Sequence, residues 1–468
     1  MKLQKAEREE QMASSDLTAV ALHRFGLGAA PDEWARANPN PQSYVLQQIT
    51  RAKPLASPLP ASDLAIRLMR QAELKRQEER EAQAASAAAS PTQPTAPAAP
   101  TPDQTLFRNE VIARFEQFTQ TTEPLIERLV AFWSNHFAIA VNKASLVRGT
   151  AGAFEREAIR PHILGRFSDM LKSVAQHPTM LIYLDNIQSI GPNSRAAKQN
   201  QRGLNENLAR EILELHTLGV DAGYSQEDVT SFARILTGWT MAQPFDDALY
   251  GGRFTFSPIR HEPGSHRVLG KDYHEEGLDQ GLATLDDLAH HPATARHLCF
   301  KLARHFLADV PPPALVQNLT HIFITSDGDL GAVTRKLITA PEAWSLPLQK
   351  MRSPLLFMIA LARAAERRPD TQTMLNELSL MGQPFWNPPG PNGFPDLTDV
   401  WRSPDNMVVR LDIAARWGRL NAALDPSQIL DETLAQYASK ATRQSIARAE
   451  TRAQAISLLF MSPEFQHC

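Results

Sequence analysis

Residues 204–239 read LNENLAREILELHTLGVDAGYSQEDVTSFARILTGW, and this stretch decides how the rest of the chain is interpreted. Its apolar spacing is typical of two helices, with a glycine-containing turn between them. An ordinary pair of structural helices does not need so many ionisable and amide side chains in so short a segment. A chemical site is therefore expected here first. The side chains concerned are Asn205, Glu206, Asn207, Arg210, Glu211, Glu214 and His216.

A helical wheel divides the first of these helices into two faces, because each residue advances by about 100 degrees. The apolar stripe consists of Leu204, Leu208, Ile212 and Leu215. The charged residues form a continuous arc on the other side. Since residues four apart on a helix can pair, we expect ion pairs of Arg210 with Glu206 and with Glu214. His216 falls on the apolar side.

Two interpretations of this charged arc stay open. In the first, the arc is a solvated face whose salt bridges stabilise the helix by roughly a few tenths of a kcal/mol each. In the second, it lines an internal cleft, where burial and like charge give the carboxylates raised or coupled pKa values suited to acid–base work or cation binding. The second interpretation makes Glu206, Arg210, Glu211 and Glu214 catalytic and gives substrate binding to Asn205 and Asn207.

A second candidate is His136, in the segment FWSNHF at 132–137. It lies in the centre of the apolar stripe of its predicted helix. A histidine there is either a hydrogen-bonded core residue or a general base or metal ligand directed into a shared interior. Glu211 and His216 are five residues apart and point away from each other, so a divalent metal is expected to use Glu211 and His136. The case for chemistry rests on His136 meeting the carboxylate arc.

A third candidate is His261, in the segment HEPGSH at 261–266. Histidines beside glycine in a loop are free to orient toward a ligand, which makes His261 a candidate for substrate binding. The alternative is an ordinary surface loop. The chain has no HExxH, no GxSxG, no GK[ST] phosphate loop and no GxGxxG after a strand. Metalloprotease chemistry of that type, serine hydrolysis, ATP hydrolysis and hydride transfer are therefore disfavoured.

The composition is that of a soluble globular protein, with 468 residues, 43% hydrophobic and 21% charged. The net charge of -3 without any block of like charge gives no reason to expect nucleic acid as a partner. The sequence has no run of about 18 apolar residues, so it predicts no membrane span. The first residues, MKLQKAEREEQMASSD, are too polar for a secretory signal. We therefore expect a cytoplasmic protein, with periplasmic location or export alongside a partner as the alternative.

Nearly all of the chain has helical periodicity, which predicts an all-α protein with one large multi-helix domain over 1–468. Well-bounded helices are expected at 123–137, 292–307, 313–324 and 330–339. Residues 86–102, rich in alanine and proline, predict a flexible insertion. Residues 240–275 predict a non-helical excursion, in which an alternating segment at 254–256 pairs with 267–269 as a small hairpin.

Several stretches together resemble the bacterial family of uncharacterised proteins known as DUF1800. They are ALHRFGLGAAPDEW at 21–34, FWSNHF at 132–137, REAIRPHILGRFSDML at 156–171, HPTMLIYLDN at 177–186, NENLAREILELHTLGVDAGYSQEDV at 205–229, ILTGW at 235–239, HPATARHLCFKLARHF at 291–306, GQPFWNPPGPNGFPD at 382–396 and SPEFQ at 462–466. The resemblance implies one mostly helical domain and carries over no catalytic residues. Members of the family resemble exported proteins, and their genes often lie beside those of a DUF1501 family that resembles sulfatases and phosphatases. The resemblance therefore also implies a DUF1501-like partner.

Two functional hypotheses follow. The first is an enzyme whose glutamate, histidine and arginine cluster binds a divalent metal or acts as acid and base on a polar substrate. The second is a non-catalytic scaffold or accessory protein that acts with the DUF1501-like companion. In the second case the charged arc is a structural network or an interface.

Overall fold

The computed structural model describes residues 16–51, 58–87, 99–198, 203–220, 222–243 and 251–468. The predicted all-α class is confirmed, since helices make up most of these residues. The amino-terminal third contains η1 (Val20–Arg24), α2 (Glu33–Ala37), α3 (Pro41–Arg51), α4 (Ser62–Ala87), α5 (Pro102–Gln120), α6 (Pro124–His136), α7 (Ser145–Phe154), η2 (Glu155–Ile159), η3 (Arg160–His162), α8 (Phe167–Gln176) and α9 (Pro178–Tyr183).

The middle third holds the short strands. Its elements are η4 (Asn186–Gln188), η5 (Ala196–Lys198), α10 (Asn207–Glu211), η6 (Ile212–His216), α11 (Gln226–Ile235), β1 (Trp239–Met241), β2 (Phe254–Phe256), β3 (His266–Val268), β4 (Lys271–Tyr273), α12 (Leu278–His290), α13 (Pro292–Phe306), α14 (Pro313–Thr325) and α15 (Leu330–Thr339). Three of the η segments, η1, η2 and η6, are π-helical. The other η segments described, η7 below included, are 3-10 helices.

The regular elements described in the carboxy-terminal third are all helices, and the segment 382–396 between two of them is not helical. This third contains α16 (Glu342–Ser345), α17 (Pro354–Ala364), α18 (Thr371–Leu380), α19 (Thr398–Trp401), α20 (Pro404–Leu420), α21 (Pro426–Thr433), η7 (Ala435–Tyr437), α22 (Lys440–Ala447), α23 (Arg452–Met461) and α24 (Pro463–Gln466). Among the described residues, every helix is too short or too polar to cross a lipid bilayer.

Proline and local capping set where many of these helices begin. Proline suits the first helical turn because its missing N–H needs no partner there. Pro124, Pro292 and Pro313 each stand at the start of a helix, and the residues before them are extended or irregular. The predicted helices at 123–137, 292–307 and 313–324 are therefore confirmed to within one residue at each end. The helix predicted at 330–339 has the bounds of α15.

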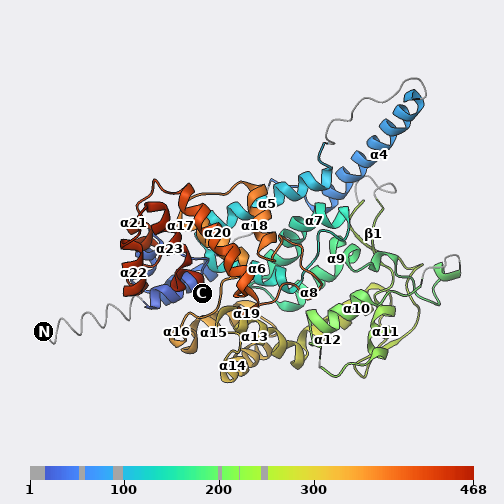
Figure 1. Cartoon of the computed structure of the whole chain (residues 1–468). Helices are drawn as coiled ribbons and strands as arrows, with labels where there is room; N and C mark the ends of the chain where they lie inside the picture. The colour runs from blue at the N-terminus through green and yellow to red at the C-terminus, as the bar shows by residue number, and fades with distance from the viewer. Residues whose placement is uncertain (1–15, 52–57, 88–98, 199–202, 221, 244–250) are drawn as a thin grey trace.

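Two large clusters and one small cluster of buried apolar side chains form the core of the described residues. The largest draws on elements between η1 and α16, and the second joins α5 to the helices from α17 onward. Helix α5 links the two, because it contacts both α7 and α17. In Figure 1 the red carboxy-terminal helices α21 to α23 lie beside the blue amino-terminal segment, and α4 extends away from the body as an arm. Segments from both ends of the chain thus build one side of the molecule.

The non-helical excursion contains two short antiparallel sheets, and the predicted strand pairing is wrong. Strand β2 pairs with β1, whereas β3 pairs with β4. Leu269 and Gly270 both have positive φ, 51° and 78°. Two consecutive residues of that kind close a tight hairpin, so β3 is paired locally with β4 and is not available to 254–256. Residues 244–250 of the excursion lie outside the described residues.

The predicted insertion at 86–102 lies mostly outside the described residues, which resume at 99. The key helix begins at Asn207 and not at Leu204. The Oδ1 atom of Asn205 accepts the backbone N–H of Asn207 at 2.9 Å, and this turn replaces the first expected helical turn. The helix then widens into the π-helical segment η6, a change that a wheel of constant pitch does not anticipate.

Candidate functional site

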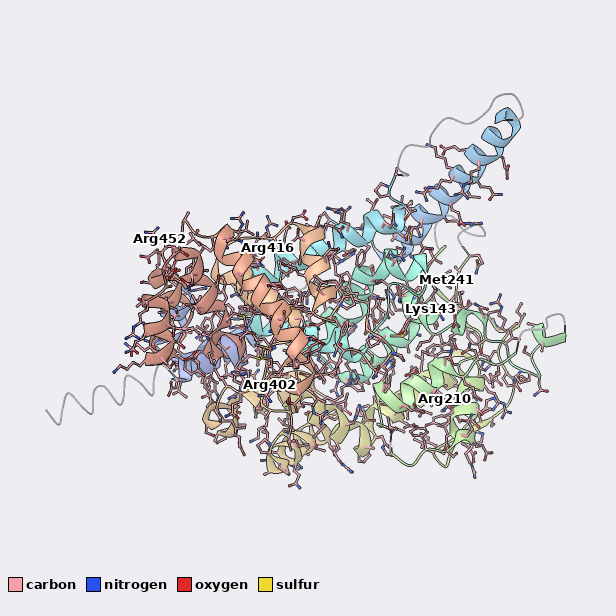
Figure 2. The ribbon with its side chains drawn as sticks, viewed as in Figure 1. Lys143, Arg210, Met241, Arg402, Arg416 and Arg452 are labelled. Carbon is pink, nitrogen blue, oxygen red and sulfur yellow. The ribbon has the colours of Figure 1, made fainter. Side chains whose placement is uncertain are left out.

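The charged arc lies where α10 and η6 face α11. Arg210 pairs with Glu206 at 3.1 Å and with Glu214 at 3.5 Å, as the four-residue spacing predicts. Glu206 also accepts hydrogen bonds from Gln226 and Thr230 of α11. The Arg210 and Glu206 side chains keep 36% and 30% of their surface exposed, and Figure 2 shows Arg210 among the α10–α12 elements at the edge of the molecule. These pairs hold α10 against α11 on a partly solvated face.

Glu211 has a different environment from Glu206. Burial raises the pKa of its carboxyl to about 7, and the negative charge of Glu214 adds to this effect while Arg210 opposes it. Tyr183 lies close enough that Glu211 contributes to raising the pKa of the tyrosine hydroxyl, after burial, to about 12. A carboxyl with a pKa near 7 can both accept and donate a proton at neutral pH.

The π-helical segment η6 carries His216 into the core. The side chain is 1% exposed, as its place on the apolar side of the wheel predicts. Thr217 follows with φ and ψ of -130° and -94°, and its hydroxyl donates to the carbonyl of Ile212 at 2.6 Å. The wider turn and this hydrogen bond end the helix with the His216 carbonyl directed at another buried side chain.

That buried side chain is His136, which α6 places 1% exposed in the core. Its Nε2 lies 3.2 Å from the carbonyl oxygen of His216, and its Nδ1 lies 2.9 Å from the Nζ of Lys301. A carbonyl oxygen only accepts, so Nε2 carries the proton and Nδ1 of the neutral ring is the acceptor for Lys301. Both ring nitrogens of His136 are therefore engaged, one as donor and one as acceptor.

Two more imidazoles surround this pair. The ring centroids of His216 and His297 lie 6.2 Å and 6.3 Å from that of His136. Both nitrogens of His216, and Nε2 of His297, are buried without a hydrogen-bond partner among the described residues. Burial first, and then the charge of Lys301, lower the pKa of His216 to about 3 and that of His297 to about 4. The same two causes, in the same order, hold the pKa of His136 well below its ordinary value.

Lys301 is the cation at the centre of this cluster. Burial lowers the pKa of its amine to about 8, with a contribution from Arg304 and opposition from Asp396. Helix α13 also carries His297 one turn before Lys301 and His305 one turn after it. His305 Nδ1 donates to Asp396 Oδ2 at 2.8 Å, and Arg128 donates to the other nitrogen of His305. One face of α13 thus joins the histidine cluster to a partly buried ion pair of His305 with Asp396.

The cluster borders a large surface hollow of about 980 Å³. His297 lines it together with Gly219, Arg296, Phe300 and His321. Residues four apart on a helix lie one above the other, so the Lys301 side chain lies one turn behind His297 along α13. His297 is therefore the member of the cluster that borders the hollow, and Lys301 and His136 are not among its lining residues.

The predicted site residues fall into three places. His136 meets His216, but its hydrogen-bond partners are not the carboxylates of the arc. His261 is separate again, with its Nδ1 3.0 Å from the carbonyl oxygen of Thr237. Within the described ranges, no three histidine, cysteine, aspartate or glutamate side chains are grouped so that they could hold a metal ion. A metal at Glu211 and His136 stays a prediction without support from this geometry.

The sequence did contain a signal for the residues that were missed. His297, Lys301 and His305 stand at intervals of four within RHLCFKLARHF, so they share one face of a helix. That face is polar although its neighbours are core residues such as Cys299, which is buried. The signal for Lys301 is therefore a row of polar residues within an otherwise apolar segment.

The fold and this cluster define a large, mostly helical protein in which histidine and lysine side chains gather between α6, η6 and α13. The chain belongs to the family described as "Protein of unknown function (DUF1800)", whose family model matches residues 20–467. The resemblance seen in the sequence is thereby confirmed. No curated protein and no solved structure matches the chain.

Proposed function

We propose that the protein is an enzyme in which Lys301 and His136 exchange protons with a polar substrate held in the adjoining hollow. One observation carries this proposal: the Lys301 amine lies 2.9 Å from a histidine nitrogen. Within the described residues, moreover, no carboxylate is ion-paired with Lys301 at 4.0 Å or less. A buried lysine that serves structure alone is normally paired with a carboxylate.

The hydrogen bonds set which groups carry protons. The His136 proton on Nε2 is held by the His216 carbonyl, so neutral Nδ1 accepts a hydrogen bond from Lys301. Because the pKa of His136 is held well below its ordinary value, a proton that Lys301 loses goes to solvent or substrate and not to Nδ1. Because the pKa of Lys301 is about 8, a large fraction of its side chain is the neutral amine without any strong base. Lys301 can then act as base or nucleophile on a group that enters the hollow.

Two measurements on the intact protein test this proposal. The first is acylation of each lysine with a limiting amount of reagent from pH 6 to 11, read by mass spectrometry. We expect Lys301 to reach half-maximal labelling near pH 8, with exposed Lys440 as internal reference. A midpoint at about 10.4, the ordinary lysine value, would contradict the proposal.

The second measurement is a screen of polar metabolites by thermal shift against the wild type, Lys301→Met and the surface control Lys440→Met. Compounds that stabilise the wild type and the control, but not Lys301→Met, are expected, because the substrate contacts Lys301. The same compounds then serve as substrates in turnover assays. If both variants keep the wild-type profile, or if no compound stabilises any of the three, Lys301 is not the site.

A second candidate function is binding of a companion protein at the rim of the same hollow. Val310, Val220 and Ile324 are 83%, 64% and 49% exposed, and all three border the hollow. Exposed aliphatic side chains gathered at one place are typical of a protein interface. The DUF1501-like companion suggested by the family resemblance is the partner proposed for it.

The test of this candidate is co-purification of the companion with two aspartate variants. Val310→Asp is expected to abolish capture, because it introduces a charge into an apolar contact. Leu380→Asp changes a leucine that is 70% exposed on α18, away from the hollow, and should leave capture intact. Equal capture by both variants would place the interface elsewhere.

A further inference from the structure

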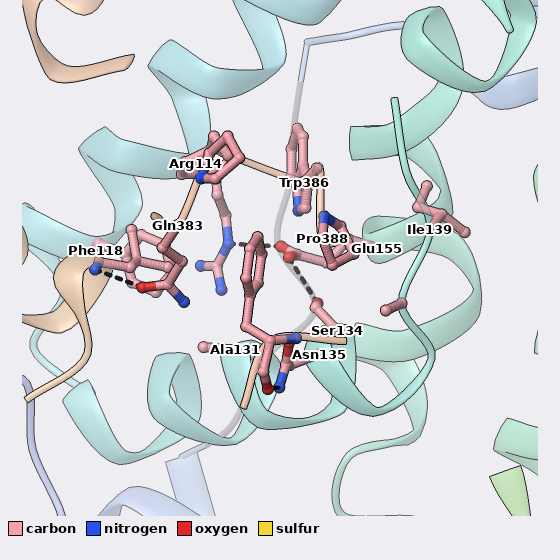
Figure 3. A pocket seen from close by; sticks show the side chains of 15 residues that line it. Arg114, Phe118, Ala131, Ser134, Asn135, Ile139, Glu155, Gln383, Trp386 and Pro388 are labelled. Carbon is pink, nitrogen blue, oxygen red and sulfur yellow. Dashed lines mark hydrogen bonds and ion pairs between the residues drawn. The ribbon is translucent and has the colours of Figure 1, made fainter. Parts of the chain in front are cut away.

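A second pocket lies beneath the proline- and aromatic-rich segment 382–396, and it has no part in the site proposed above. Figure 3 shows its interior. The void is about 70 Å³ and opens to solvent at one side. Its walls are aromatic, formed by Phe118, Phe385, Trp386 and Phe394. Its polar side chains include Arg114, Ser134, Glu155 and Gln383.

The segment over this pocket is fixed in place by hydrogen bonds. Asn135 forms two with Phe394: its Nδ2 donates to the carbonyl at 2.9 Å, and its Oδ1 accepts the backbone N–H at 2.8 Å. The backbone N–H of Val141 donates to the carbonyl of Trp386 at 3.0 Å. Trp386 itself has a φ of 47°, a conformation that costs about 1–3 kcal/mol in a large residue. The aromatic walls are therefore held in position before any ligand arrives.

Arg114 supplies a free donor inside the pocket. Its side chain is 4% exposed and pairs with Glu127 and with Glu155, yet its Nη2 has no hydrogen-bond partner among the described residues. A buried guanidinium N–H without a partner is costly, which points to a group that is missing from the site. In Figure 3 the guanidinium reaches the middle of the pocket, beside the Gln383 amide. The Gln383 Oε1 already accepts the backbone N–H of Leu355, so the NH2 group of Gln383 remains as a donor for a ligand.

The remaining polar groups limit the charge of the missing group. Ser134 donates its hydroxyl hydrogen to Glu155 at 2.7 Å, which leaves its oxygen lone pairs as acceptors. Arg160 also belongs to this group of charges, because it pairs with Glu127. Two arginines and two glutamates therefore balance. A neutral ligand fits this balance, whereas a carboxylate or an ammonium would leave an uncompensated charge near the core.

We propose that this pocket binds the acetamido group of an N-acetylated small molecule. The carbonyl oxygen would accept from Arg114 Nη2 and Gln383, the amide N–H would donate to the Ser134 oxygen, and the methyl would pack on the aromatic walls. The size agrees: a cavity of about 150 Å³ holds the six carbons of benzene. By the same ratio a void of about 70 Å³ holds about three heavy atoms, which are the methyl, the carbonyl carbon and the oxygen of an acetamido group, with its nitrogen at the opening. The rest of the ligand lies outside, toward solvent.

Saturation-transfer NMR on the full chain tests the proposal. The probes are N-acetylglucosamine and N-acetylalanine amide, each compared with its deacetylated form. We expect at least one acetylated probe to bind, with the strongest transfer at its acetyl methyl, and each deacetylated form to bind at least about tenfold more weakly, about 1.4 kcal/mol. The probe that binds distinguishes a sugar source from an amino-acid source. If neither acetylated probe binds, or if acetylation makes no difference, the proposal is overturned.

A substitution that fills the pocket provides the variant for this test. Changing Arg114 would unpair two buried glutamates, so Ala131→Leu is preferred, because Ala131 lines the pocket from α6. It should reduce binding of the acetylated probe by about tenfold while the melting temperature shows that the protein is folded. Ala441→Leu, at an exposed alanine on α22, is the control and should bind as the wild type does. Unchanged binding by Ala131→Leu would overturn the proposal. Lys301→Met should not affect it, so failure here is distinct from failure of the proposed enzyme site.

Discussion

Glu211 shows how position on one helix changes the chemistry of a residue. The carboxylates of Glu206 and Glu214, one on each side of it along the helix, are paired with Arg210. Among the described residues, Glu211 has no such ion pair, and burial raises its pKa to about 7. The sequence pattern placed all three carboxylates in a single arc. Because of burial, Glu211 titrates near neutral pH, whereas Glu206 and Glu214 form ordinary surface ion pairs with Arg210.

The pKa of Glu211 predicts the pH dependence of one variant. An acid whose pKa is raised on folding contributes stability at low pH, and this contribution is lost as pH rises from about 4.3 toward 7. Glu211→Gln should therefore raise the melting temperature relative to wild type at pH 8 and show no gain at pH 4. Glu227→Gln, at an exposed position on α11, is the control and should show no such trend. A constant difference across this pH range would contradict the assignment.

At the scale of elements, all three π-helical segments in the described chain bring ionisable side chains into the core. Segment η1 buries His23 and Arg24, η2 buries Glu155, and η6 buries His216. A π-helical turn contains an extra residue, so it shifts the register of the helix and turns polar positions inward. In this protein the shift delivers Glu155 to the acetamido pocket and His216 to His136.

The segment 382–396 gives an element-scale prediction through two glycines. Both Gly382 and Gly393 have positive φ, 81° and 76°, but a Cβ at Gly393 would lie 2.3 Å from the carbonyl oxygen of Asn135 and one at Gly382 meets nothing within 4 Å. Gly382→Ala should lose about 1–2 kcal/mol from backbone strain alone. Gly393→Ala should lose a further 1–3 kcal/mol, about the cost of overpacking, because the segment must move off α6. Denaturant unfolding of both variants measures the difference, and equal losses would contradict the close packing of Gly393 against Asn135 of α6.

At the scale of the whole molecule, buried ion pairs connect elements that are distant in sequence. Glu127 of α6 pairs with Arg114 of α5 and with Arg160 of η3, and all three side chains are almost fully buried. Burial opposes ionisation of Glu127, yet the two arginines outweigh it and lower the pKa to about 2. This ion-pair network lies between α6, which belongs to the larger apolar cluster, and α5, which belongs to the second.

Removal of this charge should have a large effect on stability. Glu127→Gln leaves buried Arg160 without its carboxylate partner and Arg114 with Glu155 alone, and we expect a loss of about 3–5 kcal/mol. Glu206→Gln removes a partner of Arg210 at a partly exposed site, where the expected loss is about 0–1 kcal/mol. Thermal and urea unfolding of both variants give the comparison. Similar losses would mean that the buried network does not stabilise the fold.

The helices and the ion pairs of Arg210 were predictable because both depend on residues close in sequence. Proline and capping residues act within one turn, and residues four apart meet on any regular helix. The strand partners of 254–256 were not predictable in this way. The turn at Leu269 and Gly270 uses a leucine where asparagine or glycine is usual, so the hairpin signal was hidden.

The amino-acid sequence by itself determined the all-α class, the main helix boundaries, the family and the inward position of His136 and His216, since these follow from local periodicity and motif. Only the tertiary structure decided which side chains meet. It brought His136 to Lys301, 165 residues away, and left the carboxylate arc on a partly solvated face. The physical reason is that pairing of a buried polar group depends on which helices pack together, and packing is set by the whole core and not by any one helix.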